Sequence, residues 1–263
     1  MPTILLINDD GIRSVGLVAM KKRLERLGKV VVVAPRDERS GIGKALTAYD
    51  CIKVMETQLS DCSKAYAITG TPADAFLLAV SKILKQLPDL LVAGINLGPN
   101  LGVDDLLNSG TLGAALEAAI HQVPAIAVSY CIWEMTEKRA EKAEVTLEEL
   151  ELTATLAQKT AEYVLERGMP TGVDIISINV PEKADPKRVK VTSLSYKGYG
   201  DLYTKQKDGY RIAGWALSSY PNDRPGTDIH AIKKGRRISI TPIKIELPHN
   251  KKELENLLKT LTA

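Results

Sequence analysis

The sequence is poor in cysteine and in aromatic side chains. Its three cysteines, Cys51, Cys62 and Cys131, are an odd number and include no C-x-x-C pair or other metal-ligand spacing. This usage argues against a disulfide scaffold and against structural zinc, and it favours reduced thiols in a cytoplasmic protein. Only one Phe is present, so we expect no aromatic platform for stacking single-stranded nucleic acid.

The chain also lacks a large excess of charge and any long hydrophobic run. Lys and Arg together number 35 and Asp and Glu 32, a net charge of +3, which is too small to indicate a nucleic-acid surface. Every apolar run falls well short of the ~20 residues that span a bilayer. The first run has no basic leader and ends in acids, unlike a signal peptide. We therefore expect a soluble cytoplasmic protein that needs neither a membrane nor a nucleic-acid polymer.

What the chain does contain is an alternation of buried strands and helices as far as about residue 180. Its 263 residues, 44% of them hydrophobic, suffice for one large α/β domain with or without an appendage. The alternation predicts a doubly wound, mostly parallel sheet. The expected strands are 3–7, 30–34, 51–55, 65–68, 89–95, 124–129 and 174–180, and the expected helices are 15–27, 72–86, 110–121 and 147–167.

The composition changes after Pro181, where Tyr, Gly and charged residues become frequent. Strand-like pieces at 187–194 and 209–217 predict a β-hairpin arm, and a strand at 237–242 and a helix at 251–262 follow. We expect residues 1–180 to form the catalytic core and residues 181–263 to form an extension that serves oligomerisation. The charged segment 131–146 is expected to be a surface excursion.

The first strand ends at two adjacent carboxylates, Asp9 and Asp10, followed by Gly11. In open α/β sheets, ligands bind at the carboxyl ends of the strands. Neighbouring carboxylates repel each other unless a cation or a proton offsets their charge. A divalent metal site explains the pair, and a solvated Asp-Gly turn with a helix-capping Asp is the alternative.

Two further loops are predicted to bring polar residues to the same rim. Loop 34–43 carries Ser40, and the glycine-rich loop 96–109 begins at Asn96. Carboxylate, hydroxyl and amide oxygens suit Mg²⁺, Mn²⁺ or Ca²⁺ rather than structural zinc. The second loop ends at Ser109, where N–H groups at a helix start favour an anion. A metal beside a phosphate cradle indicates phosphoryl chemistry. The simpler alternatives are a loop hydroxyl for Ser40, an Asx turn for Asn96 and a helix cap for Ser109.

Five short motifs along nearly the whole chain carry a family resemblance. They are ILLINDDG at 4–11, GTPAD at 70–74, GINLG at 94–98, SGT at 109–111 and SITP at 239–242. In this order they closely resemble the survival protein SurE family of metal-dependent nucleoside monophosphate phosphatases. The resemblance implies a Rossmann-like fold with an extended C-terminal hairpin that joins subunits into homodimers or homotetramers.

The same resemblance implies roles for individual residues. The activity would be that of a 5'-nucleotidase with a nucleoside monophosphate substrate and one divalent cation per subunit, Mg²⁺ or Mn²⁺. The implied metal ligands are Asp9, Asp10, Ser40 and Asn96. The implied phosphate-binding residues are Asn100, Ser109, Gly110 and Thr111. Asp9 and Asp10 are the catalytic candidates, and either could act as the base.

Other functions stay open at the level of the residues. A covalent aspartyl-phosphate route, as in haloacid dehalogenase-like phosphatases, needs a D-x-D pair, whereas Asp9 and Asp10 are adjacent. A nucleotide- or phosphate-binding module without catalysis would use the glycine-rich loop alone and leaves the hard ligands unexplained. A phosphatase for another small phosphomonoester would share the same site chemistry.

Overall fold

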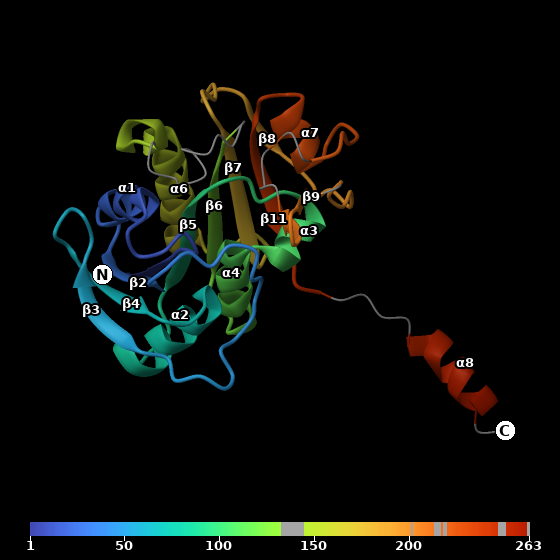
Figure 1. Ribbon diagram of the computed structural model, residues 1–263, viewed down its shortest axis with the longest axis horizontal. Coiled ribbons are helices and arrows are strands. Elements are labelled where there is room, and N and C mark those ends of the chain that lie inside the picture. Colours follow the sequence, from blue (N-terminus) through green and yellow to red (C-terminus); the bar gives the residue numbers. More distant parts are fainter. Residues whose placement is uncertain (133–144, 201, 213–216, 218–219, 247–250, 262–263) are drawn as a thin grey trace.

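The computed structural model describes residues 1–132, 145–200, 202–212, 217, 220–246 and 251–261. Figure 1 shows a central sheet with helices on both of its faces. The strands are β1 (Thr3–Ile7), β2 (Lys29–Pro35), β3 (Val54–Gln58), β4 (Lys64–Ile68), β5 (Leu90–Leu97), β6 (Ala125–Cys131), β7 (Ile175–Pro181), β8 (Val189–Val191), β9 (Tyr203–Gln206), β10 (Gly209–Ile212) and β11 (Ile238–Ile243). The helices are α1 (Val15–Leu24), α2 (Pro72–Leu78), the π-helix η1 (Ala79–Ile83), α3 (Gly102–Asn108), α4 (Gly110–Ile120), α6 (Leu147–Arg167), α7 (Asp228–Lys233) and α8 (Lys251–Leu261).

The sheet confirms the predicted doubly wound, mostly parallel class. Its strand order is β3-β4-β2-β1-β5-β6-β7-β11-β8. Strands β4, β2, β1, β5, β6 and β7 pair in parallel, while β3 and β11 pair antiparallel to β4 and β7. β1 therefore lies between β2 and β5, the two strands whose loops carry the other predicted ligands.

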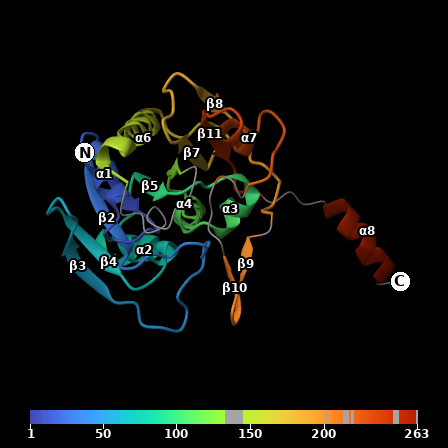
Figure 2. The same cartoon turned by 45° about the horizontal axis from the view of Figure 1, so that its top comes forward.

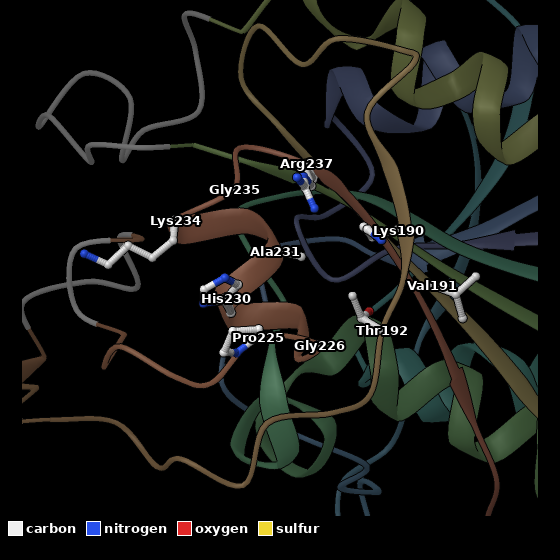
Figure 3. A pocket seen from close by; sticks show the side chains of 10 residues that line it. All are labelled: Lys190, Val191, Thr192, Pro225, Gly226, His230, Ala231, Lys234, Gly235 and Arg237. Atoms are coloured by element: carbon white, nitrogen blue, oxygen red, sulfur yellow. The ribbon is translucent and has the colours of Figure 1, made fainter.

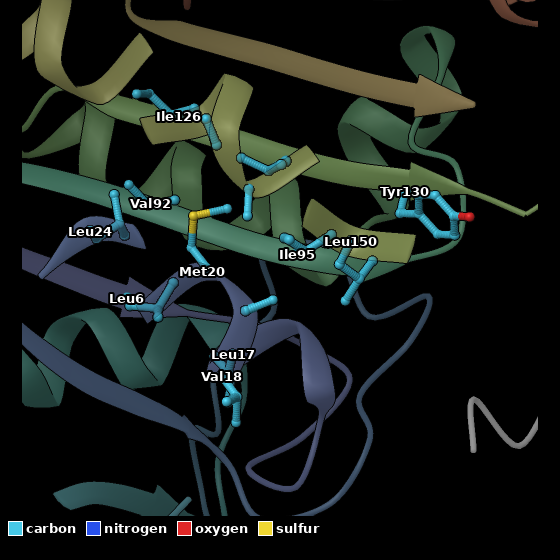
Figure 4. Close-up of a cluster of buried hydrophobic side chains, with 14 of the residues drawn as sticks. Leu6, Leu17, Val18, Met20, Leu24, Val92, Ile95, Ile126, Tyr130 and Leu150 are labelled. Atoms are coloured by element: carbon cyan, nitrogen blue, oxygen red, sulfur yellow. The ribbon is translucent and has the colours of Figure 1, made fainter. Parts of the chain in front are cut away.

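Each central strand is buried on both faces, which explains its uninterrupted apolar sequence. Because side chains alternate along a strand, Ile4 and Leu6 face a cluster with α1 and α6, whereas Leu5 and Ile7 face one with α2 and α4. Figure 4 shows the first cluster, in which Met20 of α1 lies over the sheet. None of the described helices combines the length and the apolar character needed to cross a membrane.

The prediction of one helix over 72–86 was wrong in its second half. Thr71 caps α2 in a capping box with Asp74, but the regular helix ends at Leu78 and continues as the π-helix η1. Ser81 Oγ donates to Leu77 O at 2.6 Å, a side-chain bond that competes with regular backbone pairing. Apolar spacing alone does not reveal this change in winding.

The prediction of an irregular loop over 96–109 was also wrong in part. β5 continues to Leu97, and α3 occupies Gly102–Asn108. Gly102 has φ +72°, and Leu101 before it provides no capping side chain, so the helix start carries none of the usual sequence signals. A helix inside this segment gives its backbone a fixed position beside the carboxyl end of β5.

The C-terminal residues extend the sheet and form a separate hairpin. β11 and β8 join the sheet beside β7, and β9 and β10 pair antiparallel. The predicted hairpin is therefore present, but β9 and β10 form it, whereas the predicted piece 187–194 belongs to the main sheet as β8. Figure 2 shows this hairpin projecting from the body of the molecule. Of the predicted strand 209–217, residues 213–216 lie outside the described part of the chain, as do residues 133–144 of the segment 131–146.

Candidate metal and phosphate site

Three loops meet at the carboxyl ends of β2, β1 and β5. The backbone amide of Arg39, in the loop after β2, donates to Asp9 O at 2.7 Å. The backbone amide of Leu97, at the end of β5, donates to Asp10 Oδ2 at 2.9 Å. The two aspartates after β1 are thus bonded to both neighbouring loops, as the predicted sheet requires.

Asp9 is packed against the start of α4. It is 3% exposed, and Thr111 Oγ1 donates to its Oδ1 at 2.5 Å. A Cβ atom placed on Gly110 would lie 2.8 Å from Asp9 Cβ and 3.0 Å from Arg39 O, so only glycine fits between helix and carboxylate. The positive end of the α4 dipole stabilises a carboxylate at this place.

Asn96 lies beside Asp10 and is oriented by its own loop. Asn96 is 8% exposed, and its Nδ2 donates to Gly98 O at 2.8 Å. This bond fixes the rotation of the amide, so Oδ1 is the end that can ligate a cation. Asp10 is held from the same strand, because the amide of Leu97 follows Asn96 directly.

Ser40 follows Arg39 in the loop that contacts Asp9, but its hydroxyl has another partner. Ser40 is exposed, and its Oγ donates to Glu38 Oε1 at 2.5 Å. The structure therefore places Ser40 on the predicted rim with its side chain turned towards a neighbouring carboxylate. Glu38 was not among the predicted residues, and the only signal for it is its place in a polar loop after a strand.

The donor set fits a hard divalent cation. In the part of the chain that the structure describes, no three His, Cys, Asp or Glu side chains gather closely enough to hold a metal ion. A site here must therefore combine the two carboxylates with amide or hydroxyl oxygens, which Mg²⁺ and Mn²⁺ accept. Asn8 Oδ1, next to Asp9, is buried with no hydrogen-bond partner among the described residues, and such an atom indicates a further partner.

The four predicted phosphate-binding residues have different surroundings. Ser109 is the N-cap of α4 and its Oγ accepts from Leu112 N at 3.2 Å, which is the simpler of its two predicted roles. Thr111 is bonded to Asp9. Asn100 is buried, and its Nδ2 donates to Ser129 Oγ at 2.8 Å. The role of these residues towards phosphate stays a prediction.

Ser129 and Asn179 belong to the same rim and were missed from the sequence. They lie near the carboxyl ends of β6 and β7 and are Cα partners across the two strands. Asn179 Oδ1 accepts from Asn100 N at 3.0 Å, and its Nδ2 donates to Asn100 O at 2.9 Å. Single polar residues near the carboxyl ends of apolar strands are the signal that could have found them.

The GTPAD motif at 70–74 holds the loop between β2 and β3 in place through Asp74. Asp74 Oδ2 accepts from Thr47 Oγ1 at 2.6 Å and from Thr71 N at 2.9 Å. These bonds hold the loop between β2 and β3 against the start of α2. This loop lines an open cavity of about 490 Å³ that includes Arg39 and Tyr49. The cavity therefore borders the loop that contacts Asp9.

A second pair of carboxylates is buried where the start of α7 meets α3. Asp105 Oδ2 accepts from Tyr220 Oη and from Leu101 N, each at 2.5 Å. Asp228, at the start of α7, accepts from Gly102 N at 2.7 Å. Burial, assisted by the nearby Asp228 charge and opposed by the two hydrogen bonds, raises the pKa of Asp105 to about 8. The pair fixes the segment after β5 to the C-terminal residues.

Asp105 is expected to make stability depend on pH. The ordinary pKa of its carboxyl is 3.8, so between about pH 4 and pH 8 Asp105 keeps a proton in the folded chain that it loses on unfolding. The free energy of unfolding therefore falls as pH rises. The slope from this group is up to about 1.4 kcal/mol per pH unit. Asp105→Asn should flatten the slope in chemical denaturation, whereas Asp208→Asn, in the exposed β9–β10 turn, should not. An unchanged slope in Asp105→Asn contradicts this expectation.

Comparisons with known proteins agree with the resemblance in the motifs. The family model described as survival protein SurE matches residues 4–201. A protein named 5'-nucleotidase SurE from Methanobrevibacter smithii is 36% identical over 92% of this chain and 94% of its own. One from Methanothrix thermoacetophila is 39% identical over 94% of each chain. The crystal structure of SurE protein from Aquifex aeolicus, 31% identical, covers 100% of both chains with a TM-score of 0.75.

Proposed function

The chain belongs to the survival protein SurE family, and from this membership we propose that it is a divalent-metal-dependent 5'-nucleotidase. Its reaction would be hydrolysis of nucleoside 5'-monophosphates to nucleoside and phosphate. The relatives named 5'-nucleotidase SurE support the reaction class. The observation that carries the proposal is the Asp9–Asp10 pair, held at the end of β1 by Thr111 and Leu97.

Asp9, Asp10, Ser40 and Asn96 would hold one divalent cation per subunit, Mg²⁺ or Mn²⁺. When bound, such a cation acts as a Lewis acid on the phosphate and lowers the pKa of water. Thr111 keeps the Asp9 carboxylate in one orientation. The backbone N–H groups in the first turn of α4, which begins at Gly110, would stabilise negative charge on an anion bound there. Either carboxylate of the pair can take the proton from the attacking water.

The nucleoside part of the substrate has room in the cavity beside Arg39. Its wall is formed mainly by the loop between β2 and β3, with small and apolar side chains and Tyr49, whose side chain is fully exposed. A flat aromatic ring at the edge of an open cavity can stack on a base. Asp74 belongs to α2 and bonds Thr47 of this loop, so α2 holds the cavity wall in place.

A phosphate-release screen tests the proposed function. Nucleoside 5'- and 3'-monophosphates and sugar phosphates are each incubated with Mg²⁺, Mn²⁺ or EDTA. We expect release from the nucleotides with either metal and its loss in EDTA, because the reaction needs the cation. Binding of nucleotide without release under every metal condition would favour the non-catalytic module. Preferred release from sugar phosphates would favour a phosphatase of another small phosphomonoester.

We also propose that residues 181–263 join subunits into a homodimer or homotetramer. Leu257 and Leu258 of α8 are 52% and 59% exposed, and Figure 1 shows α8 standing clear of the sheet and its helices. Leu254 and Leu261 are exposed as well. An apolar helix face left in water is unfavourable and typically marks an interaction surface.

Analytical ultracentrifugation of the full chain tests this assembly. Leu257→Lys is expected to shift the protein towards a smaller species, because it places a charge on the apolar face of α8. Glu255→Lys also introduces a lysine into α8, but at an exposed position that already carries a charged side chain. This control should leave the assembly unchanged. A monomeric wild type would refute the proposal.

A further inference from the structure

A second cavity lies away from the metal and phosphate site, between β8 and α7. Its volume is about 310 Å³, and its walls are formed by residues 190–192, 225–226, 230–231, 234–235 and 237. Figure 3 shows Lys190 and Arg237 on one side and His230 facing them from α7, while the Lys234 side chain extends outwards. It shares no residue with the site around Asp9. The cavity is therefore separate from that site and lies in the C-terminal part of the chain.

The walls of this cavity are positively charged without compensation. None of the ten residues that line it is Asp or Glu. In the described ranges of the chain, the side chains of Lys190, Lys234 and Arg237 take part in no ion pair. An anion in the cavity would offset the positive charge of the Lys190 and Arg237 side chains.

The remaining wall atoms suit a small phosphorylated molecule. His230 Nδ1 lies 3.0 Å from Asp223 O. Because a carbonyl oxygen only accepts, Nδ1 carries its proton there. In the neutral ring Nε2 is then an acceptor, which can take a hydrogen bond from a hydroxyl or a protonated phosphate oxygen of a ligand. Arg237 provides a planar fork that matches phosphate oxygens, and Lys190 adds a point charge. Val191 and Pro225 give the cavity an apolar wall. The volume of the cavity lies at the lower end of the range found for small-molecule binding sites.

We propose that this cavity binds a small phosphorylated anion without help from a metal ion. The ligand class is set by the Lys190 and Arg237 side chains, which together can neutralise two negative charges. The recessed shape and the small net charge of the chain favour a small molecule over a nucleic-acid strand, which needs an extended basic surface. The proposal does not depend on the nucleotidase reaction.

Calorimetric titration of the full-length protein with inorganic pyrophosphate and with AMP, both in EDTA, tests the proposal. EDTA removes the cation that binding at the Asp9 site requires. We expect binding to the wild type, weakened at least about tenfold in Lys190→Gln/Arg237→Gln. The control Lys205→Gln/Arg211→Gln removes the same two charge types from the exposed β9–β10 hairpin and should bind like the wild type. Tighter AMP than pyrophosphate binding would identify a nucleotide as the ligand.

Four outcomes would overturn the proposal. Wild-type protein that binds neither probe has no such site. Equal weakening in both double variants means that diffuse surface charge attracts the probes. Binding that appears only after Mg²⁺ is added belongs to the Asp9 site. Tighter binding of a short DNA duplex, lost in Lys190→Gln/Arg237→Gln, means an extended polyanion surface. Unchanged thermal midpoints and unchanged metal-dependent turnover show that the variants are folded.

Discussion

Asp9→Asn is expected to lower the turnover of nucleotide hydrolysis by at least about 100-fold. Loss of a group that only supports a metal ligand typically costs 10–100-fold, and loss of a ligating carboxylate should cost more. Asn keeps the shape of the side chain and can still accept from Thr111, so the change removes charge and little else. Phosphate release from AMP at saturating Mg²⁺ measures the loss of turnover. Calorimetric titration with Mg²⁺ measures the loss of metal affinity.

The matched control for this variant is Asp37→Asn. Asp37 lies in the loop after β2, close to the site, but it is exposed and bonded to Arg36. Its replacement also removes one negative charge, so a general electrostatic effect on substrate or metal would be seen in both variants. Full activity in Asp9→Asn, or equal losses in the two variants, would refute the metal role of Asp9.

A shared rim for the polar loops could be predicted from the sequence, whereas the order of the strands in the sheet could not. An apolar run that stops at a polar turn marks the carboxyl end of a buried strand, and parallel strands bring these ends to one edge. In the structure β1 lies between β2 and β5, which brings Asp9, Ser40 and Asn96 to adjacent strand ends. The prediction of a shared rim uses only the period of the apolar residues and the parallel direction of the strands.

The individual contacts could not be read in the same way. Whether Ser40 faces Glu38 and whether Thr111 faces Asp9 depend on side-chain rotations set by the final packing. The polar network of Asn100 with Asn179 joins residues 79 positions apart, and no local pattern connects them. The π-helix after α2 likewise depends on backbone bonding that apolar spacing does not encode.

The Thr111 contact suggests a second role for that residue beside the predicted binding of phosphate. Its hydroxyl donates to the buried Asp9 Oδ1 at 2.5 Å, so in this structure it orients the carboxylate from the first turn of α4. A carboxylate that loses such a donor in a buried place keeps the desolvation cost and gains rotational freedom. We therefore propose that Thr111 is a positioning residue for Asp9.

Thr111→Val is accordingly expected to lower turnover and Mg²⁺ affinity by about 10–100-fold, the usual cost of losing a group that orients a metal ligand. Val has nearly the same shape but no donor, so the packing of α4 against Asp9 and Gly110 is kept. Steady-state hydrolysis of AMP should show the loss in kcat, with a smaller change in KM, and calorimetry should show the loss in metal affinity.

Thr111→Ser keeps the hydroxyl and removes only a methyl group, so it is the control that separates hydrogen bonding from packing. If the bond to Asp9 matters, Ser retains most of the metal affinity and turnover while Val does not. If Thr111 only fills space, Thr111→Val keeps the stability, turnover and metal affinity of the wild type. Only Thr111→Ser then loses thermal stability, because it removes the methyl group. If the hydroxyl instead binds the phosphate directly, Val raises KM and leaves metal affinity unchanged, because the Asp9 carboxylate is then not its main partner.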